Sequence, residues 1–174
     1  MRLTNNKYID ASICRKFIAD ILRRLGTEAS TAERWAELLV ETSLLGFDTH
    51  GIRMLDRYLK HIQAGGIDLG AEPRITDDVG SCVRMDGQAG LGHIAADGAT
   101  RIAVERAEEH GISCVTLRNC NHVGACGIYA RQAAAGLHRH LLGGEQGGHS
   151  SLGRKTGNAG FERGCHSGSY CGKS

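Results

Sequence analysis

The first 137 residues alternate apolar positions at helical spacing with short strand-like runs. Residues 10–25 are predicted to form a helix that is closed by Gly26, and its apolar face is the set Ile13, Phe17, Ile21 and Leu25. A second helix is predicted to begin at a capping box, in which Ser30 and Glu33 satisfy each other's free N–H groups. Its buried positions are Trp35, Leu38, Leu39 and Leu45.

Further along the chain, helical and strand-like patterns follow one another. A third predicted helix carries Leu55, Tyr58, Leu59 and Ile62 and stops at the glycine pair 65–66. The remaining predicted elements are a strand over 83–85, a helix over 94–110, a buried strand over 112–117 and a helix over 125–136. This order predicts an α/β fold with a helical N-terminal lobe.

The composition changes at residue 138. From there to Ser174 the sequence contains no Ile, Val, Met, Trp or Asp, and ten of the 37 residues are Gly. Such a stretch buries too little apolar surface to offset the entropy of ordering it. We therefore divide the chain into a folded part, residues 1–137, and a Gly-rich tail, residues 138–174, which is either disordered or translated out of frame.

The out-of-frame alternative follows from the genetic code. Codons can be chosen for residues 138–174 whose shifted reading gives a buried-strand pattern followed by a Pro-Trp-Gly-Gly turn, as in a folded enzyme. The nucleotide sequence around codon 138 decides between a frameshift and a genuine tail.

Charge and hydropathy exclude several classes of partner. The 21 basic and 19 acidic side chains are nearly balanced and form no basic block, so we expect no nucleic-acid partner. The apolar runs are too short for a membrane span, and residues 1–7 have no signal-peptide core. The seven cysteines are then interpreted as reduced thiols, and the expected location is cytoplasmic.

The segment 48–51, Asp-Thr-His-Gly, lies between two predicted helices. Its polar residues either cap a helix or take part in chemistry. In the second interpretation His50 exchanges a proton, a role that suits histidine as a residue type, and Thr49 supplies a neighbouring hydroxyl. Arg53 and Arg57 share a helical face with His50, and a guanidinium binds a carboxylate with two parallel hydrogen bonds. We assign substrate binding to Arg53 and expect Arg57 to point to solvent.

A second polar segment, residues 119–124, follows a predicted strand and precedes a helix. Ligands in α/β proteins bind at the carboxyl ends of strands, so His122 is either a catalytic residue or a hydrogen-bonded loop histidine. Asn119 and Gly124 are candidates for cofactor binding, because a glycine lets the backbone approach a ligand closely.

Two further patterns are weaker. The glycines of 87–92 have the spacing GxxGxG rather than the dinucleotide-binding GxGxxG, so a plain turn is favoured over a phosphate site. The spacing of Cys120, His122 and Cys126 matches no standard zinc site, so we expect no bound metal.

Together these motifs resemble the malate/L-lactate dehydrogenase family, whose nicotinamide-binding fold is not of the Rossmann type. The resemblance covers residues 1–137 and rests on the segments 46–51, 55–58, 64–67, 86–92, 110–112 and 119–124. It implies a helical lobe plus an incomplete nicotinamide-binding domain. It also implies hydride transfer between NAD or NADP and a small 2-oxo or 2-hydroxy acid, and a homodimer in the intact family.

The resemblance also implies roles for single residues. In relatives a Ser-His pair relays the proton; here Thr49 stands for the Ser and keeps its hydroxyl, and His50 is the histidine. The histidine matching His122 accepts a proton or contacts substrate. The family's substrate-binding Arg falls on Met54, with Arg53 just before it. Because relatives are roughly twice as long, beyond one core's usual size, we expect a truncated and weak or inactive enzyme. The alternative is a non-catalytic dimerisation or binding module.

Overall fold

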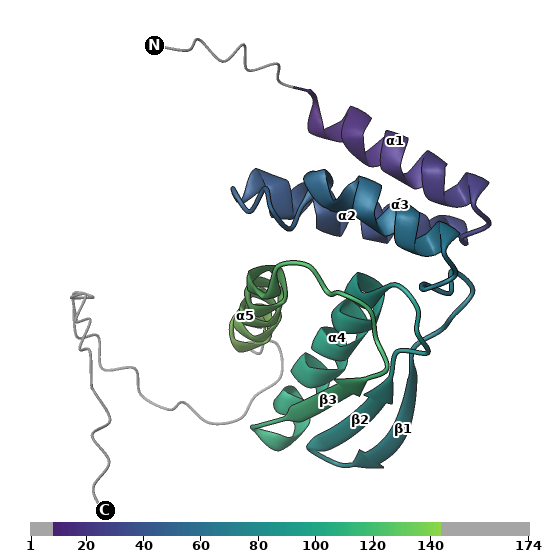
Figure 1. The fold of residues 1–174 in the computed structure, drawn as a ribbon. Helices are drawn as coiled ribbons and strands as arrows, with labels where there is room; N and C mark the ends of the chain where they lie inside the picture. Colours follow the sequence, from purple (N-terminus) through teal and green to yellow (C-terminus); the bar gives the residue numbers. More distant parts are fainter. Residues whose placement is uncertain (1–8, 144–174) are drawn as a thin grey trace, which may run out of the picture. The chain divides into compact units, whose positions relative to one another are not determined.

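The computed structural model describes residues 9–143, with side chains up to residue 136. The elements, in order, are α1 (Ala11–Arg24), α2 (Ala29–Leu44), a 3-10 turn η1 (Ile52–Met54), α3 (Leu55–Gln63), β1 (Arg74–Val79), β2 (Cys82–Asp86), α4 (Gly92–His110), β3 (Cys114–Arg118) and α5 (Cys126–Gly143). Helices α1, α2 and α3 form one group, and α4 and α5 lie beside the sheet (Figure 1). The expected α/β fold with a helical lobe is confirmed. Of the predicted tail, residues 144–174 lie outside the described part.

Helix α1 packs on α2 through a different face from the predicted one. Its buried residues are Ile18, Ala19 and Leu22, whereas Ile13 and Phe17 are 62% and 61% exposed. The sequence of α1 carries two apolar stripes at helical spacing, and periodicity alone does not say which stripe meets the neighbouring helix. The stripe with the small Ala19 is the one that lies against α2, so the predicted face was wrong.

The start of α2 is also corrected. Glu28, not Ser30, is the N-cap, and its carboxylate accepts a hydrogen bond from the Thr31 N–H at 2.9 Å. The Ser30 hydroxyl donates to the same carboxylate instead of capping the helix. Because Glu28 satisfies a free N–H group of the first turn, the helix begins two residues before the predicted start. These hydrogen bonds also stabilise the charged carboxylate. The largest contribution comes from the Ser30 hydroxyl, and together they lower the pKa of Glu28 to about 2.

The main core lies where the three N-terminal helices meet the first turn of α4. Its fully buried members are Ile18, Leu22, Ala32, Trp35, Ala36, Leu39 and Val40, joined by Tyr58, Ile67 and Leu91. The apolar positions predicted for α2 are therefore confirmed at Trp35, Leu38 and Leu39, which are all 0% exposed.

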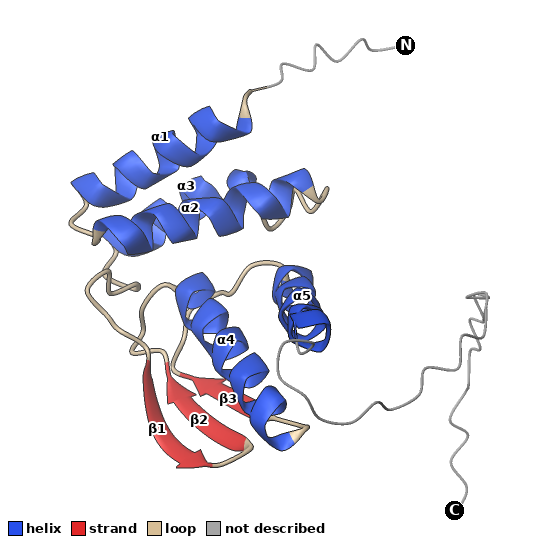
Figure 2. Ribbon diagram, turned by 180° about the vertical axis from the view of Figure 1, so that it is seen from behind, coloured by secondary structure: helices blue, strands red, loops and turns tan. Residues whose placement is uncertain are grey.

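Within residues 9–143 the sheet has three strands, in the order β1-β2-β3. Strands β1 and β2 form an antiparallel hairpin, and β2 and β3 are parallel, with Val83 opposite Val115 and Met85 opposite Leu117. A parallel pair needs a long crossover, which here is α4. That helix covers one face of the sheet (Figure 2). The crossover places the ends of β2 and β3 side by side, so the loops after Asp86 and Arg118 are neighbours.

Three sequence expectations differ at the sheet and the last helix. Strand β1 was missed, because all six of its residues are exposed and show no alternation. Strand β3 runs over Cys114–Arg118 and is not buried, because it lies at one edge of the described sheet. Ile112, which was predicted to begin this strand, lies before it and is 74% exposed. Helix α5 continues past the expected end at 136 to Gly143. Within residues 9–143, no helix is both long and apolar enough to cross a bilayer.

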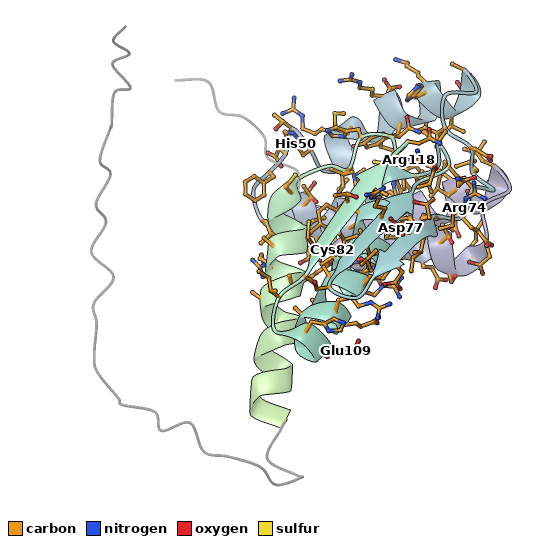
Figure 3. The ribbon with its side chains drawn as sticks, turned by 90° about the horizontal axis from the view of Figure 1, so that it is seen from below. His50, Arg74, Asp77, Cys82, Glu109 and Arg118 are labelled. Carbon is orange, nitrogen blue, oxygen red and sulfur yellow. The ribbon has the colours of Figure 1, made fainter. Side chains whose placement is uncertain are left out.

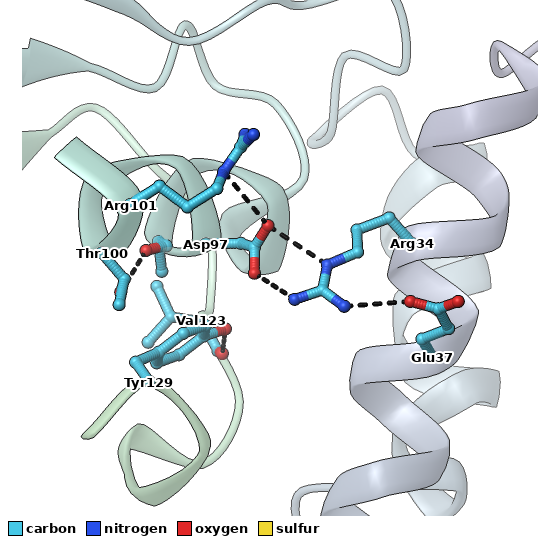
Figure 4. A network of polar contacts seen from close by, with 8 residues as sticks. Arg34, Glu37, Asp97, Thr100, Arg101, Val123 and Tyr129 are labelled. Carbon is cyan, nitrogen blue, oxygen red and sulfur yellow. Dashed lines mark hydrogen bonds and ion pairs between the residues drawn. The ribbon is translucent and has the colours of Figure 1, made fainter. Parts of the chain in front are cut away.

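An ion-pair network joins α2 to α4 (Figure 4). The Arg34 guanidinium donates to both carboxylate oxygens of Asp97, from Nη2 at 2.5 Å and from Nε at 3.2 Å. The Asp97 side chain is only 7% exposed, and Arg34 also pairs with Glu37 at 2.9 Å. Charge-assisted bonds in this two-pronged geometry are among the strong ones in proteins. The network therefore fixes α4 against the helical lobe.

We expect Asp97→Asn to lower the free energy of unfolding by about 2 kcal/mol, because it removes charged hydrogen bonds from a buried acceptor. Glu37→Gln is the matched control, since Glu37 pairs with the same guanidinium but its side chain is 51% exposed. It should change stability by less than about 1 kcal/mol. Urea unfolding of both variants measures the difference, and equal effects would contradict the role assigned to Asp97.

Candidate active site

Three helices bring aromatic side chains together beneath the loop that carries His122. Trp35 comes from α2, Tyr58 from α3 and His93 from the first turn of α4, and they are 0%, 4% and 1% exposed. The Trp35 indole N–H donates to His93 Nδ1 at 3.1 Å. The Tyr58 hydroxyl lies 3.5 Å from His93 Nε2 and 2.7 Å from His122 Nδ1. A polar chain therefore runs from the buried indole to His122.

His50 lies at the outer end of this row of polar contacts, beside His122. It is exposed at the surface (Figure 3), and its ring stacks on that of His122 with centroids 5.7 Å apart and planes inclined by 27°. The Thr49 hydroxyl lies 2.9 Å from His50 Nδ1. The fold thus brings the adjacent residues Thr49 and His50 together with His122, which lies more than seventy residues further along the sequence.

A cavity of about 300 Å³ opens beside His122. It is lined by Met54, Arg57, Tyr58, His61, Ile67, Asn121 and His122. No carboxylate is among these described lining residues, whereas one guanidinium and two imidazoles are. Such a lining suits a small anion. Both Arg53 and Arg57 are exposed, as expected for Arg57, but only Arg57 is among the residues that line this cavity.

Burial and neighbouring groups set the protonation of these side chains. Burial, and then His122, lowers the pKa of His93 to about 3, so its ring is neutral. The pKa of His122 is also lowered, by partial burial and then by His50 and Arg57. Burial raises the pKa of Tyr58 to about 12, which keeps its hydroxyl protonated. Near neutral pH the site therefore holds a neutral phenol between two neutral imidazoles.

The sequence pattern of the malate/L-lactate dehydrogenase family matches residues 9–137. This chain belongs to that family. The match includes every residue of the polar chain from Trp35 to His122 and both predicted motifs, 48–51 and 119–124.

Individual relatives agree with the family. The chain is 34% identical over 126 residues to hydroxycarboxylate dehydrogenase B of Escherichia coli, covering 72% of this chain and 35% of that protein. It is 34% identical over 134 residues to a malate dehydrogenase of Pyrococcus abyssi, covering 73% and 37%. This chain thus spans little more than a third of the length of these relatives.

Solved structures show the same likeness. Malate dehydrogenase from Entamoeba histolytica superposes with a TM-score of 0.72 at 29% identity, over 75% of this chain and 36% of that one. Sulfolactate dehydrogenase from Methanocaldococcus jannaschii gives 0.69 at 28% identity, over 71% and 36%. The described residues of this family member are therefore a partial α/β domain with its helical lobe.

Asn119 and Gly124, the predicted cofactor contacts of this family member, make contacts within the protein. The Asn119 side chain donates to Asp86 Oδ1 at 3.0 Å. Gly124 has a φ of +77°, and a Cβ on it would lie 2.5 Å from His93 Nε2, so this glycine is required by close packing against the His93 ring. Their assignment to a cofactor stays a prediction.

The glycine-rich turn 87–90 does not fit a phosphate group either. All four of its backbone N–H groups are bonded, to Arg118 O, Asp86 Oδ1, Asn119 O and Gly87 O, each at 2.9 Å. A phosphate cradle needs free N–H groups. The backbone N–H groups of the turn 87–90 and the side-chain amide of Asn119 are therefore already hydrogen-bonded within the protein.

Sequence reasoning missed His93 and treated Trp35 and Tyr58 only as core residues. The available signal was a histidine in the otherwise apolar run 91–96, Leu-Gly-His-Ile-Ala-Ala. A buried histidine needs hydrogen-bond partners. Its partners come from α2 and α3, so they were not visible from local spacing.

Proposed function

We propose that this chain carries the acid-binding and proton-exchanging part of a dehydrogenase site for a small 2-oxo or 2-hydroxy acid, with NAD or NADP as hydride carrier in the complete enzyme. The observation that supports this most is the cavity beside His122, where Arg57 and two imidazoles face a small space. A cavity of about 300 Å³ is at the lower end of the range for ligand sites, which suits a small acid.

In this proposal Arg57 holds the carboxylate of the acid. A guanidinium offers two parallel N–H donors to a carboxylate, so it fixes the orientation of the acid as well as its charge. The C2 oxygen of the acid then lies near the His122 imidazole, and His50, whose ring stacks on that of His122, exchanges the proton. The dehydrogenase and reductase names of the relatives agree with this chemistry.

The arginine pair tests the proposal. We expect Arg57→Gln to weaken pyruvate binding at least tenfold, about the contribution of hydrogen bonds to a charged group. Arg53→Gln, four residues earlier and also exposed, should change the dissociation constant by less than about twofold. Titration of each labelled variant with pyruvate, followed by the NMR shifts of the His122 resonances, measures both constants.

Two outcomes would overturn the proposal. Pyruvate that binds equally to both variants would remove Arg57 from the site. A chain that binds neither pyruvate nor malate, yet remains folded, would favour the non-catalytic binding module. The homodimer, the cytoplasmic location and the choice between NAD and NADP stay predictions.

A further inference from the structure

The three buried aromatic rings beneath His122 are held rigidly by each other. Trp35 and Tyr58 meet edge to face with centroids 5.4 Å apart and planes at 73°, and Tyr58 and His93 meet at 5.2 Å and 84°. Trp35 and His93 complete the set at 5.7 Å and 85°. Edge-to-face contacts on all three sides restrict the rotation of each ring. The polar atoms at the ring edges therefore have fixed partners.

The indole sets the direction of the hydrogen bonds. An indole N–H is only a donor, so His93 Nδ1, at 3.1 Å from it, must be the acceptor and carries no proton. Because His93 is neutral, its single ring proton lies on Nε2, which faces the Tyr58 oxygen at 3.5 Å. The side of the Tyr58 oxygen toward His93 is thereby occupied by a donor.

The donor and acceptor roles at Tyr58 in turn determine those at His122. With His93 donating to its oxygen, Tyr58 satisfies its own O–H by donating to His122 Nδ1 at 2.7 Å. If His122 instead carried its proton on Nδ1, two N–H groups would point at one phenol oxygen. The phenol proton would then have no acceptor among its described contacts, which is costly for a residue only 4% exposed.

We propose that Trp35 and His93 are positioning residues that act through Tyr58 to hold neutral His122 in the tautomer protonated on Nε2. His122 then offers the cavity a hydrogen-bond donor. The Nε2–H of His122 suits an acceptor oxygen, such as the carbonyl oxygen of a 2-oxo acid. His122 is therefore not the base that takes a proton from a hydroxyl. Resting on the proposed function, this assigns proton exchange to His50, whose Nδ1 is paired with the Thr49 hydroxyl at 2.9 Å.

The tautomer can be observed without any ligand or turnover. In the full chain with ¹⁵N-labelled histidine, at about pH 8 and so well above the ordinary histidine pKa, we expect His122 to show an unprotonated Nδ1 and a protonated Nε2. Trp35→Phe keeps an aromatic ring but removes the indole N–H, and Tyr58→Phe removes only the phenolic hydroxyl. Each should abolish the single-tautomer signal of His122 and give a mixture. His61→Gln is the control. His61 lines the same cavity, but the hydrogen bonds described from Trp35 to His122 do not include it.

A wild-type His122 that carries its proton on Nδ1 would overturn the inference, as would an unchanged tautomer in both phenylalanine variants. The circular dichroism of each variant shows whether it is folded, and Tyr58→Phe provides the test if Trp35→Phe is not. The expected tautomer together with a failure to bind pyruvate would contradict the proposed function but support this inference. Pyruvate binding by a protein whose His122 is protonated on Nδ1 would support the proposed function but contradict this inference.

Discussion

Replacing Gly92 with alanine is expected to destabilise the fold by about 3 kcal/mol, at the upper end of the usual cost of overpacking. Gly92 is the first residue of α4, and a Cβ there would lie 2.1 Å from the Asn121 carbonyl oxygen and 2.5 Å from that of His122. Both atoms belong to the backbone, so no side-chain rotation relieves the contact. The loop that carries His122 would have to move.

That loop is not free to move. The Asn121 side-chain amide donates to the backbone oxygens of Ala89 at 2.8 Å, Gly90 at 3.0 Å and Gly66 at 3.1 Å. We therefore also expect Gly92→Ala to break the hydrogen bond between Tyr58 and His122 and to abolish pyruvate binding.

Gly98→Ala is the matched control in the same helix. Beyond its own stretch of helix backbone, no atom lies within 4 Å of a Cβ built on Gly98, so alanine should stabilise the helix by about 0.5–1 kcal/mol. Urea unfolding compares the two variants. Similar stabilities for Gly92→Ala and Gly98→Ala would show that the loop does not rest on Gly92.

Acid is expected to unfold this protein through His93. The pKa of His93 is lowered to about 3 in the folded chain, first by burial and then by His122, whereas in the unfolded chain it is near 6.5. Between these values the unfolded chain binds a proton that the folded chain does not. Stability contributed by neutral His93 is therefore complete above pH 6.5 and is lost as the pH falls toward 3, with a slope of up to about 1.4 kcal/mol per pH unit.

The neighbours of His93 help to separate this effect from others. Trp35 of α2 does not titrate, Tyr58 of α3 titrates far above this range, and His122 contributes with the same sign because its pKa is also lowered. His93→Gln should flatten the pH dependence of the unfolding free energy between pH 6.5 and 4, whereas His61→Gln at an exposed position should not. Parallel curves for the wild type and His93→Gln would contradict the role of His93.

The helices were predictable because their signals are local. Apolar spacing and terminal glycines located α2, α3 and α4 to within a few residues. The face of α1 was not predictable, since Ile13 and Ile18 belong to two stripes of similar apolar character. Strand β1 was missed because an exposed edge strand needs no apolar alternation.

The site shows the same division between local and long-range information. His50, Thr49 and His122 stood out from their loops, but which of Arg53 and Arg57 lines the cavity depended on backbone geometry. Arg53 lies in the 3-10 turn η1 and Arg57 in α3, so the continuous helical register assumed from the sequence does not apply across them. The Trp35 and His93 contacts join residues 58 positions apart, which no local pattern reports.

The position of Trp35 gives the protein an optical reporter. It is the only tryptophan in the sequence, it is fully buried, and its N–H is bonded to His93. The tryptophan fluorescence of the chain, excited at a wavelength that tyrosine does not absorb, therefore comes from a single indole at the inner end of the site. Separation of α2 from α4 would expose this indole to water and shift its emission to the red. Unfolding, acid titration and the displacement caused by Gly92→Ala can thus all be followed in the unlabelled protein through the light emitted by one side chain.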